Sequence, residues 1–203
     1  MKKIITYISS IFFTAIIISA CSGDGSNENS GVDELTIGSQ IWMNKNLDAD
    51  KFRNGDPIPQ AKTLEEWEEF SNKKQPAWSY YENDSINGEK YGKLYNWYAV
   101  NDPRGLCPTG WRLPTHDEWT ALTHALGGET KAGAQLKGKG LAAGFRGSDG
   151  TYGGLGAYAY WWSSTGSGIN GAWGRFVDGT QSGIFMMDGY KRSAFSVRCV
   201  AKR

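Results

Sequence analysis

The stretch of sequence that decides the fold is Cys107-Pro108-Thr109-Gly110-Trp111-Arg112-Leu113-Pro114-Thr115-His116-Asp117-Glu118-Trp119. Thr115 and Glu118 have the spacing of a capping box, in which a hydroxyl and a carboxylate accept hydrogen bonds from the free N–H groups at a helix start. Gly127 and Gly128 can supply the left-handed cap at the helix end. Between these ends runs an apolar stripe at helical spacing, made of Trp119, Leu122 and Leu126. We therefore predict that a short strand meets an amphipathic helix here.

The same helix carries both histidines of the chain, His116 and His124. They lie eight residues apart, whereas two ligands of one metal on one helix are spaced four residues apart. We expect both side chains at the surface or at its boundary, and we expect no metal or other cofactor.

Before this helix, the sequence predicts a hairpin over residues 35–43 with its turn near Gly38 and Ser39. A second helix is predicted to begin at Thr63, where Glu66 completes another capping box, and to end by residue 74. Residues 80–91, YYENDSINGEKY, are polar and turn-rich. A calcium site is the alternative for this run, but the acidic cage of an EF-hand loop is missing, so solvated turns are predicted.

After the helix, we predict one more short helix over residues 131–136 and a glycine-rich stretch over residues 138–156. Four strands bounded by Gly, Asp or Ser follow at residues 157–163, 172–177, 184–187 and 195–201. In the last strand Cys199 alternates in phase with apolar residues, which predicts that its side chain faces the core.

The composition favours one α+β domain of short antiparallel strands, two or three helices and long glycine-rich loops. The chain has 203 residues, of which 39% are hydrophobic, with Gly 27 and Trp 9. That is enough apolar surface for one core, and the glycine and tryptophan counts favour a turn-rich fold with large aromatic anchors. The formal net charge is +1 and no basic stripe is present, so nucleic acid is excluded as a partner.

The N-terminus has the features of a bacterial lipoprotein signal. Positively charged Lys2 and Lys3 precede a mainly apolar run at 4–18, which is shorter than the roughly 20 residues that span a bilayer. The run ends in Ile18-Ser19-Ala20-Cys21, which resembles a lipobox. We predict cleavage after residue 20 and lipidation of Cys21, including palmitate. An ordinary signal peptide with an incidental cysteine is the alternative.

Residues 21–34 are rich in Gly, Ser, Asn and Asp, and this composition predicts a flexible tether to the domain at residues 35–203. Several acyl chains give a stable anchor, because each buried methylene adds roughly 0.8 kcal/mol. Ser22 in place of Asp points away from inner-membrane retention, and the acidic residues Asp24 and Glu28 weakly resemble a surface-export signal. We therefore expect an outer-membrane lipoprotein, displayed on the cell surface or facing the periplasm.

The other two cysteines, Cys107 and Cys199, are then left in an exported and oxidising setting. We predict that they form a disulfide, and two buried free thiols are the alternative.

Five segments resemble the Fibrobacter succinogenes major paralogous domain (FISUMP), which is common in lipoproteins of Fibrobacterota and Bacteroidota. These segments are IWMNKNLD (41–48), FRNGDPIP (52–59), EKYGKLYNWYAVNDPRGLCPTGWRLPTHDEW (89–119), YWWSST (160–165) and FSVRCV (195–200). The resemblance extends from about residue 36 to residue 200. It departs at 136–144, which is shorter than expected, so a site that used this loop would be in doubt.

The resemblance implies a C-type lectin-like fold, because the family is similar to the formylglycine-generating and sulfatase-modifying domains. Residues 112–119 match their RLPT-x-x-EW segment. A bridge between the first helix region and the last strand is common in C-type lectin-like domains, which agrees with pairing of Cys107 and Cys199. The reactive cysteine pair of formylglycine generation and the calcium-binding trios of true C-type lectins are missing, so neither activity is implied.

No catalytic constellation is evident, and we expect a non-enzymatic binding or adhesion module for a glycan or an envelope protein. Ser163, Ser164 and Thr165 have no evident base. An enzyme acting on envelope polysaccharide or protein is an alternative, with acid–base candidates in predicted turns at Asp149, Asp178 and Asp188. A purely structural scaffold of an envelope complex is another.

Aromatic residues near the predicted loops are candidates for stacking on sugar rings: Tyr152, Tyr158, Trp161, Trp162 and Trp173. The alternative for each is core packing, and because Trp161 and Trp162 point to opposite faces of a strand, at least one is expected in the core. Separately, Asp84-Ser85-Ile86 resembles the short O-glycosylation motif of Bacteroidota, which makes Ser85 a candidate modification site.

Overall fold

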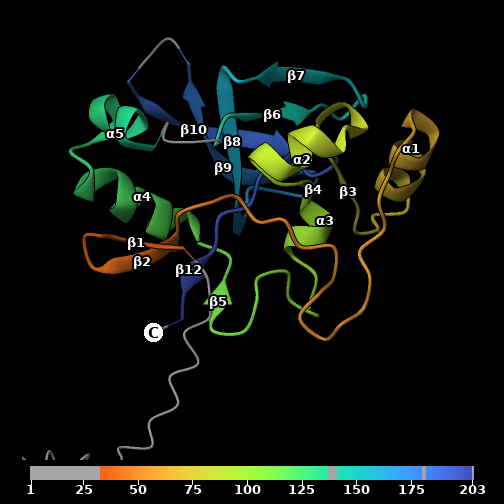
Figure 1. The fold of residues 1–203 in the computed structure, drawn as a ribbon, viewed down its shortest axis with the longest axis horizontal. Helices are drawn as coiled ribbons and strands as arrows, with labels where there is room; N and C mark the ends of the chain where they lie inside the picture. Colours follow the sequence, from red (N-terminus) through yellow and green to blue (C-terminus); the bar gives the residue numbers. More distant parts are fainter. Residues whose placement is uncertain (1–32, 137–140, 180–181, 203) are drawn as a thin grey trace, which may run out of the picture. The chain divides into compact units, whose positions relative to one another are not determined.

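The strand and helix predicted around residues 111–126 are both present. The computed structural model of the protein describes residues 33–136, 141–179 and 182–202. In it, β5 (Trp111–Arg112) leads into α4 (His116–Ala125) (Figure 1). Thr115 and Glu118 form the expected capping box, and Gly127 and Gly128 both have positive φ. The local sequence signals therefore fix this corner of the fold.

Two sheets make up the β-structure. The smaller sheet has the order β1 (Glu34–Ile37), β2 (Gln40–Met43), β12 (Val200–Ala201) and β5. The larger sheet has the order β10 (Ile184–Tyr190), β9 (Gly171–Asp178), β8 (Tyr158–Gly166), β6 (Ala143–Arg146), β11 (Ala194–Phe195), β4 (Leu94–Asn96) and β3 (Trp78–Ser79), and β7 (Tyr152–Leu155) pairs with β6. All of these pairs are antiparallel except β6 with β8. The fold class is α+β, as predicted.

The described residues contain five α-helices, more than the two or three predicted. They are α1 (Leu64–Asn72), α2 (Ser85–Tyr91), α3 (Trp97–Val100), α4 and α5 (Glu129–Leu136), and a 3₁₀ turn, η1 (Tyr81–Asn83), precedes α2. The prediction of solvated turns over residues 80–91 is therefore wrong. Asp84 caps α2 by accepting from the Ile86 N–H, and Gly88 lets the Tyr80 ring pack directly on the helix.

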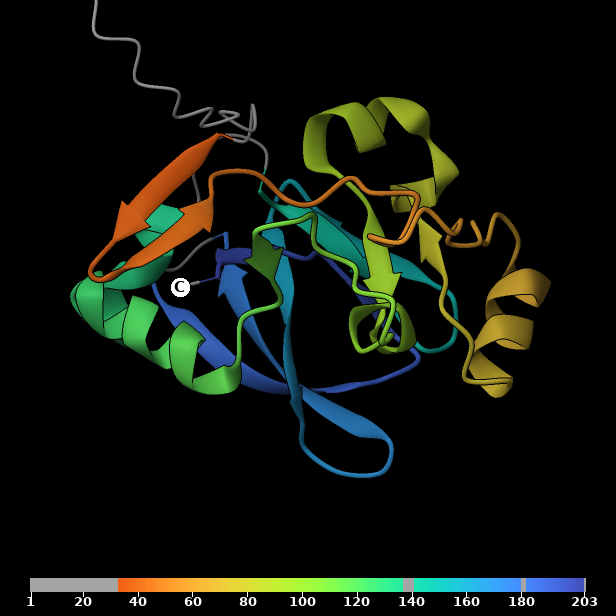
Figure 2. The same cartoon turned by 90° about the horizontal axis from the view of Figure 1, so that it is seen from below.

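Two helices and one hairpin cover one face of the larger sheet. Figures 1 and 2 show α4 and α5 side by side next to the β1–β2 hairpin, with α1 at the far end of the domain. The core beneath α4 contains Trp42, Trp119 and Trp161, with neighbouring ring centroids 4.7 and 5.7 Å apart. These three rings anchor the hairpin and the helix to the sheet.

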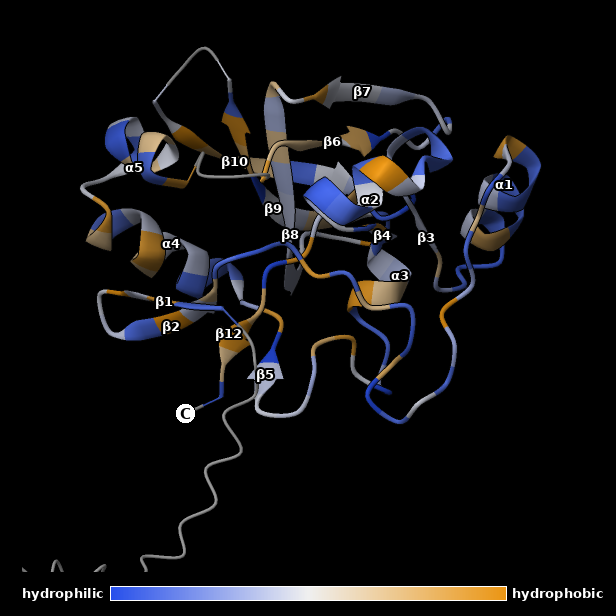
Figure 3. Cartoon of the chain, viewed as in Figure 1, coloured by the Kyte–Doolittle hydropathy of each residue, from blue (hydrophilic) through white to orange (hydrophobic). Residues whose placement is uncertain are grey.

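Hydrophobic residues occur in short stretches of each element, as Figure 3 shows for β2, β10, β12 and α4. Among the described residues, none of the helices has the length and apolar character needed to cross a membrane. The core is instead assembled from many short elements.

The predicted last strand is divided between the two sheets. β11 belongs to the larger sheet and β12 to the smaller one, and residues 196–199 between them are all buried. The Cys199 side chain faces the core, as predicted, and its backbone C=O accepts from the Met43 N–H at 3.0 Å. This segment therefore connects the two sheets.

Cys107 and Cys199 form the predicted disulfide, with an S–S distance of 2.03 Å. The bridge joins the loop before β5 to the segment before β12. Both cysteines are fully buried in the core that also contains Leu106 and Val197.

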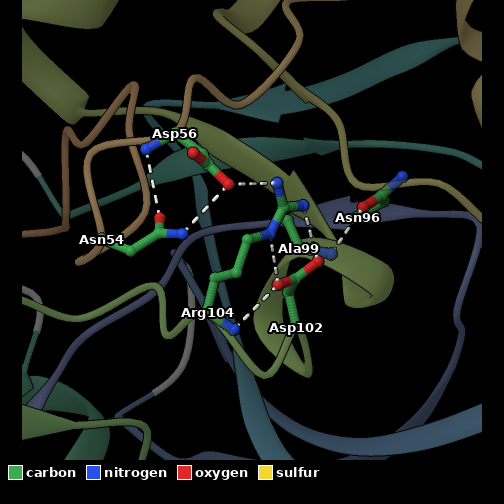
Figure 4. Close-up of polar contacts among 6 residues, drawn as sticks. All are labelled: Asn54, Asp56, Asn96, Ala99, Asp102 and Arg104. Atoms are coloured by element: carbon green, nitrogen blue, oxygen red, sulfur yellow. Dashed lines mark hydrogen bonds and ion pairs between the residues drawn. The ribbon is translucent and has the colours of Figure 1, made fainter.

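An arginine-centred network closes the long connection between β2 and α1 (Figure 4). The Arg104 guanidinium donates two hydrogen bonds to Asp102, at 2.8 and 2.9 Å, and one to Asp56, at 3.1 Å. Asn54 also donates to Asp56, and the guanidinium lies 4.0 Å from the Phe52 ring centroid. Hydrogen bonding by Arg104 lowers the pKa of the Asp102 carboxyl, while partial burial opposes this.

We expect loss of the disulfide to lower the free energy of unfolding by about 4–5 kcal/mol, because the bridge restricts the unfolded chain across a sequence separation of 92. Urea denaturation of the oxidised protein and of a Cys107→Ala, Cys199→Ala double variant measures this. Reduced wild-type protein is the control for lost side-chain volume. A loss below about 1 kcal/mol in both would contradict the prediction.

We expect Asp102 to stabilise the protein at neutral pH and to lose this effect in acid. Its pKa is lowered in the folded state, so below about pH 4 the unfolded chain binds the proton first and folding weakens. Asp102→Asn should cost about 1 kcal/mol at pH 7, because the ion pair is partly exposed, and should flatten the pH dependence between pH 4 and pH 2. Parallel stability curves for the two proteins would argue against it.

Candidate functional site

The face of the larger sheet opposite α4 carries a row of aromatic rings. Cross-strand pairing places Tyr160 opposite Phe176 and Phe176 opposite Phe185, so their side chains share one face. Trp161 and Val177 alternate with them and point toward α4 and α5. Neighbouring ring centroids in the row Phe185, Phe176, Tyr160 and Phe195 are 5.2, 5.7 and 5.3 Å apart.

Part of this row forms the floor of an open groove of about 420 Å³, which we call the aromatic groove. Its apolar lining comes from Phe145, Tyr160, Met187 and Phe195. Its polar lining comes from Ser148, Asp149, Thr151, Asp188, Tyr190 and Ser193. An apolar surface with polar groups beside it is the usual composition of a small-ligand site.

A second hollow, of about 310 Å³, lies beside the groove and shares Ser148 and Tyr190 with it. Its remaining described lining residues are Tyr98, Asn170 and Arg192, and we call it the arginine cleft. It brings together α3, the end of β10 and the tip of the β8–β9 hairpin. Figure 2 shows that this hairpin projects from the sheet.

The β6–β7 turn positions Ser148 between the two hollows. The Gly147 N–H donates to the Thr151 C=O at 2.7 Å, and Gly150 has a φ of +81°. The Asp149 carboxylate accepts from the Thr151 hydroxyl at 2.7 Å and from its backbone N–H at 3.1 Å. These two hydrogen bonds lower the pKa of Asp149, so its side chain is ionised at neutral pH.

Lys191 fixes the loop on the other side of the arginine cleft. Its ammonium donates to the Gly168 C=O at 2.8 Å and to the Ile169 C=O at 3.1 Å, and it lies 4.5 Å from the Trp97 ring centroid. Its backbone N–H donates to the Asn170 C=O at 2.9 Å. The hairpin tip is thereby held against the residues that follow β10.

The aromatic rings of the two hollows differ in what their faces contact. Tyr160 is stacked between Phe176 and Phe195 and presents little free ring face. In the described part of the chain, neither Tyr98 nor Tyr190 makes an aromatic or cation–π contact. Tyr190 is 68% exposed. These two tyrosines are therefore the rings most available to a ligand.

Trp161 and Trp162, both predicted to stack on a ligand, are fully buried, so this prediction is corrected for both. The Trp161 Nε1–H donates to the Asn46 side chain at 2.8 Å. The Trp162 Nε1–H donates to the Tyr95 C=O at 2.8 Å, and its ring packs on Phe195. The middle of β8 is covered on both faces, so both tryptophans are core residues.

Tyr152 and Trp173 are half-buried, and neither lines the groove or the cleft. The Tyr152 ring packs between Tyr81 and the Arg146 guanidinium. The Trp173 ring packs on His116, with centroids 5.4 Å apart. Half-buried Tyr158 stacks beside Tyr160. The structure therefore places the open rings at positions that the sequence did not single out.

Of the three acid–base candidates predicted in turns, Asp178 and Asp188 lie instead in β9 and β10, because these strands extend further than predicted. Asp149 and Asp188 both line the aromatic groove, and Asp188 accepts a hydrogen bond from the Ser167 hydroxyl. The Ser163 hydroxyl donates to the Trp173 C=O at 2.8 Å. Burial and the nearby Arg175 lower the pKa of His116, and its ring lies against Trp173. No described histidine ring is hydrogen-bonded to a hydroxyl of residues 163–165.

Of the two remaining predicted sites, the structure describes only Ser85, which lines neither the groove nor the cleft. Ser85 is exposed at the first position of α2, directly after the capping residue Asp84. Cys21, the predicted lipidation site, lies outside the described residues. Within the described residues, no group of histidine, cysteine and acidic side chains has the arrangement of a metal site.

Sequence reasoning missed Tyr98, Tyr190 and Arg192. The alternation in Tyr158-Ala-Tyr160 could have indicated an aromatic face on β8, but only the register with β9 and β10 shows which rings meet. The arginine cleft combines residues from positions 98, 148, 170 and 190–192. No spacing rule links positions so far apart.

Comparison with known proteins identifies the family. Residues 35–201 match the Fibrobacter succinogenes major domain, which covers nearly all of the described chain. Searches of curated proteins and of solved structures each found no match. This chain therefore belongs to the Fibrobacter succinogenes major domain family.

Proposed function

We propose that this protein is a non-enzymatic, envelope-anchored lipoprotein whose domain binds a glycan through the aromatic groove and the arginine cleft. The observation that carries the proposal is the exposed Tyr190 ring, shared by two adjoining hollows and free of aromatic contact with the described residues. An exposed tyrosine ring between two adjoining hollows offers a ligand both an apolar face and a hydroxyl.

The lining of the two hollows suits a sugar. The C–H face of a sugar ring packs on an aromatic face, and its hydroxyls need both acceptors and donors. Ionised Asp149 supplies an acceptor, while Asn170 and the hydroxyls of Ser148 and Tyr190 supply both kinds of group. Both hollows are open to solvent, so a chain of several sugars can lie along them.

A C-type lectin-like fold is part of the proposal. The bridge between Cys107, in the loop before β5 and α4, and Cys199, just before the last strand, supports it, because such a bridge is common in that fold. The family's similarity to the sulfatase-modifying domains points in the same direction.

The environment of Asp149 suits a hydrogen-bond acceptor better than a general acid. A general acid needs a pKa raised toward neutrality, whereas hydrogen bonds from Thr151 lower the pKa of Asp149. Hydrolysis of an envelope polysaccharide and a purely structural role are the alternatives. Release of reducing ends from a bound glycan would favour the first alternative, and stable capture of an envelope complex from intact cells without glycan binding would favour the second.

Residues 1–21 support the location that we propose. The charged start, short apolar run and Ser19-Ala20-Cys21 ending are those of a lipoprotein signal. We infer a lipid anchor on Cys21 in the outer membrane, with residues 21–34 as the tether between this anchor and the domain. Display on the cell surface would bring the site into contact with external glycans.

We expect Tyr190→Ala to weaken glycan binding roughly tenfold, because the variant loses one stacking ring that makes no aromatic contact with the described residues. A glycan array probed with residues 33–203 identifies the ligand. Titration calorimetry then measures the dissociation constants of the wild type and the variant. Ile86→Ala removes a similarly exposed apolar side chain from α2 and is the matched control. Equal affinity of Tyr190→Ala and wild type would place the ligand elsewhere.

We expect Cys21→Ser to abolish lipidation and to move the protein from the membrane fraction to the soluble fraction in its native host. The reason is that diacylglycerol transfer needs the thiol, which serine lacks. Metabolic labelling with a palmitate analogue and membrane fractionation check this. Labelled Cys21→Ser protein would rule out this anchor.

A further inference from the structure

We infer that the arginine cleft binds an oxyanion, and that the glycan is therefore an acidic one in which a carboxylate or sulfate group contacts Arg192. This inference rests on the proposed glycan-binding function and names the chemical class of its ligand.

Arg192 is set apart by its lack of partners. Its Nε is buried and has no hydrogen-bond partner, and its guanidinium makes no ion pair with a described residue. Each of the other described arginines donates at least one hydrogen bond, as Arg146 does to the C=O groups of Ala61 and Thr63. A buried donor without a partner is costly, so a ligand that satisfies it gains affinity.

The surroundings of Arg192 favour an anion. None of the described residues that line the arginine cleft carries a carboxylate, and the neutral ones offer hydroxyl and amide donors from Tyr98, Ser148, Asn170 and Tyr190. Tyr98 and Arg192 line the same hollow, where burial raises the pKa of Tyr98 and the positive charge of Arg192 opposes this. A planar guanidinium with neutral donors beside it is suited to a two-oxygen anion.

The adjoining aromatic groove disfavours negative charge on the part of the ligand that it would contact. Asp149 and Asp188 line the aromatic groove, and carboxylates there accept hydrogen bonds from sugar hydroxyls but repel further negative charge. A ligand with acid groups along its whole length, such as an acidic peptide, is therefore disfavoured. A sugar chain that places one acid group in the cleft and hydroxyls over the groove fits both hollows.

The test uses pairs of ligands that differ only in charge. A neutral oligosaccharide that carries one terminal uronic acid is compared with the same oligosaccharide as its methyl ester, and a singly sulfated oligosaccharide with its unsulfated form, by calorimetry at one ionic strength with residues 33–203. We expect the charged member of at least one pair to bind roughly 10- to 100-fold more tightly, as hydrogen bonds to a charged group would give. The pair that responds distinguishes a carboxylate from a sulfate.

Variants then show whether the preference for the charged ligand depends on Arg192. Arg192→Gln should remove it, and Arg192→Lys, which keeps the charge but has one nitrogen, should retain only part of it. Lys131→Gln removes a charge from α5, outside both hollows, and should leave the preference unchanged. A cooperative thermal unfolding transition shows that each variant is folded. If Arg192→Gln does not fold, the binding of the charged and neutral ligands is compared with Arg192→Lys instead.

Three outcomes would overturn the inference. Equal binding of the charged and neutral members, with Tyr190→Ala still weakening both, would leave the proposed glycan-binding function in place and remove the role of Arg192. Arg192-dependent binding of polyglutamate at the affinity of the acidic glycan would assign the cleft to acidic peptides. Absence of binding to any glycan would overturn the proposed function as well.

Discussion

The fold depends on the path of one buried segment, residues 194–201. Its first residues pair with β4 and β6, the Ser196 N–H donates to the Tyr160 C=O, and the Leu47 N–H donates to the Val197 C=O. Its last residues lie between β2 and β5. Within it, Arg198 is so deeply buried that desolvation lowers the pKa of its guanidinium to about 10. This segment therefore joins the two sheets, carries one cysteine of the disulfide and contributes to the packing of β8.

The proposed binding site and the tryptophan core lie on opposite faces of the larger sheet. Where α4 and α5 cover the sheet, the tryptophans pack in a closed core. On the opposite face the rings stack on one another across neighbouring strands, whereas Tyr98 and Tyr190, which line the arginine cleft, make no aromatic contact with the described residues. A rigid aromatic row therefore supports a more open margin, as a binding surface requires.

Signals between residues close in the sequence predicted the local structure well. Features that depend on residues far apart in the sequence were predicted poorly. The capping boxes at Thr63 and Thr115 placed two helices because the interacting groups are three residues apart. The disulfide followed from the cysteine count. The stacking residues could not be assigned, because whether Trp162 is buried depends on Tyr95 and Phe195, which only tertiary pairing brings to it. The arginine cleft is non-local for the same reason.

The position of β12 also has a consequence for how the chain matures. β12 lies between β2 and β5 in the smaller sheet, so the hairpin made first has no strand beside it until the last residues are present. The partner of Cys107 is equally late, at position 199. A ribosome makes the chain from its N-terminus, so the smaller sheet and the disulfide cannot be completed until residues 199–201 have been made. Until then, the β1–β2 hairpin and Cys107 both lack their partners from this segment.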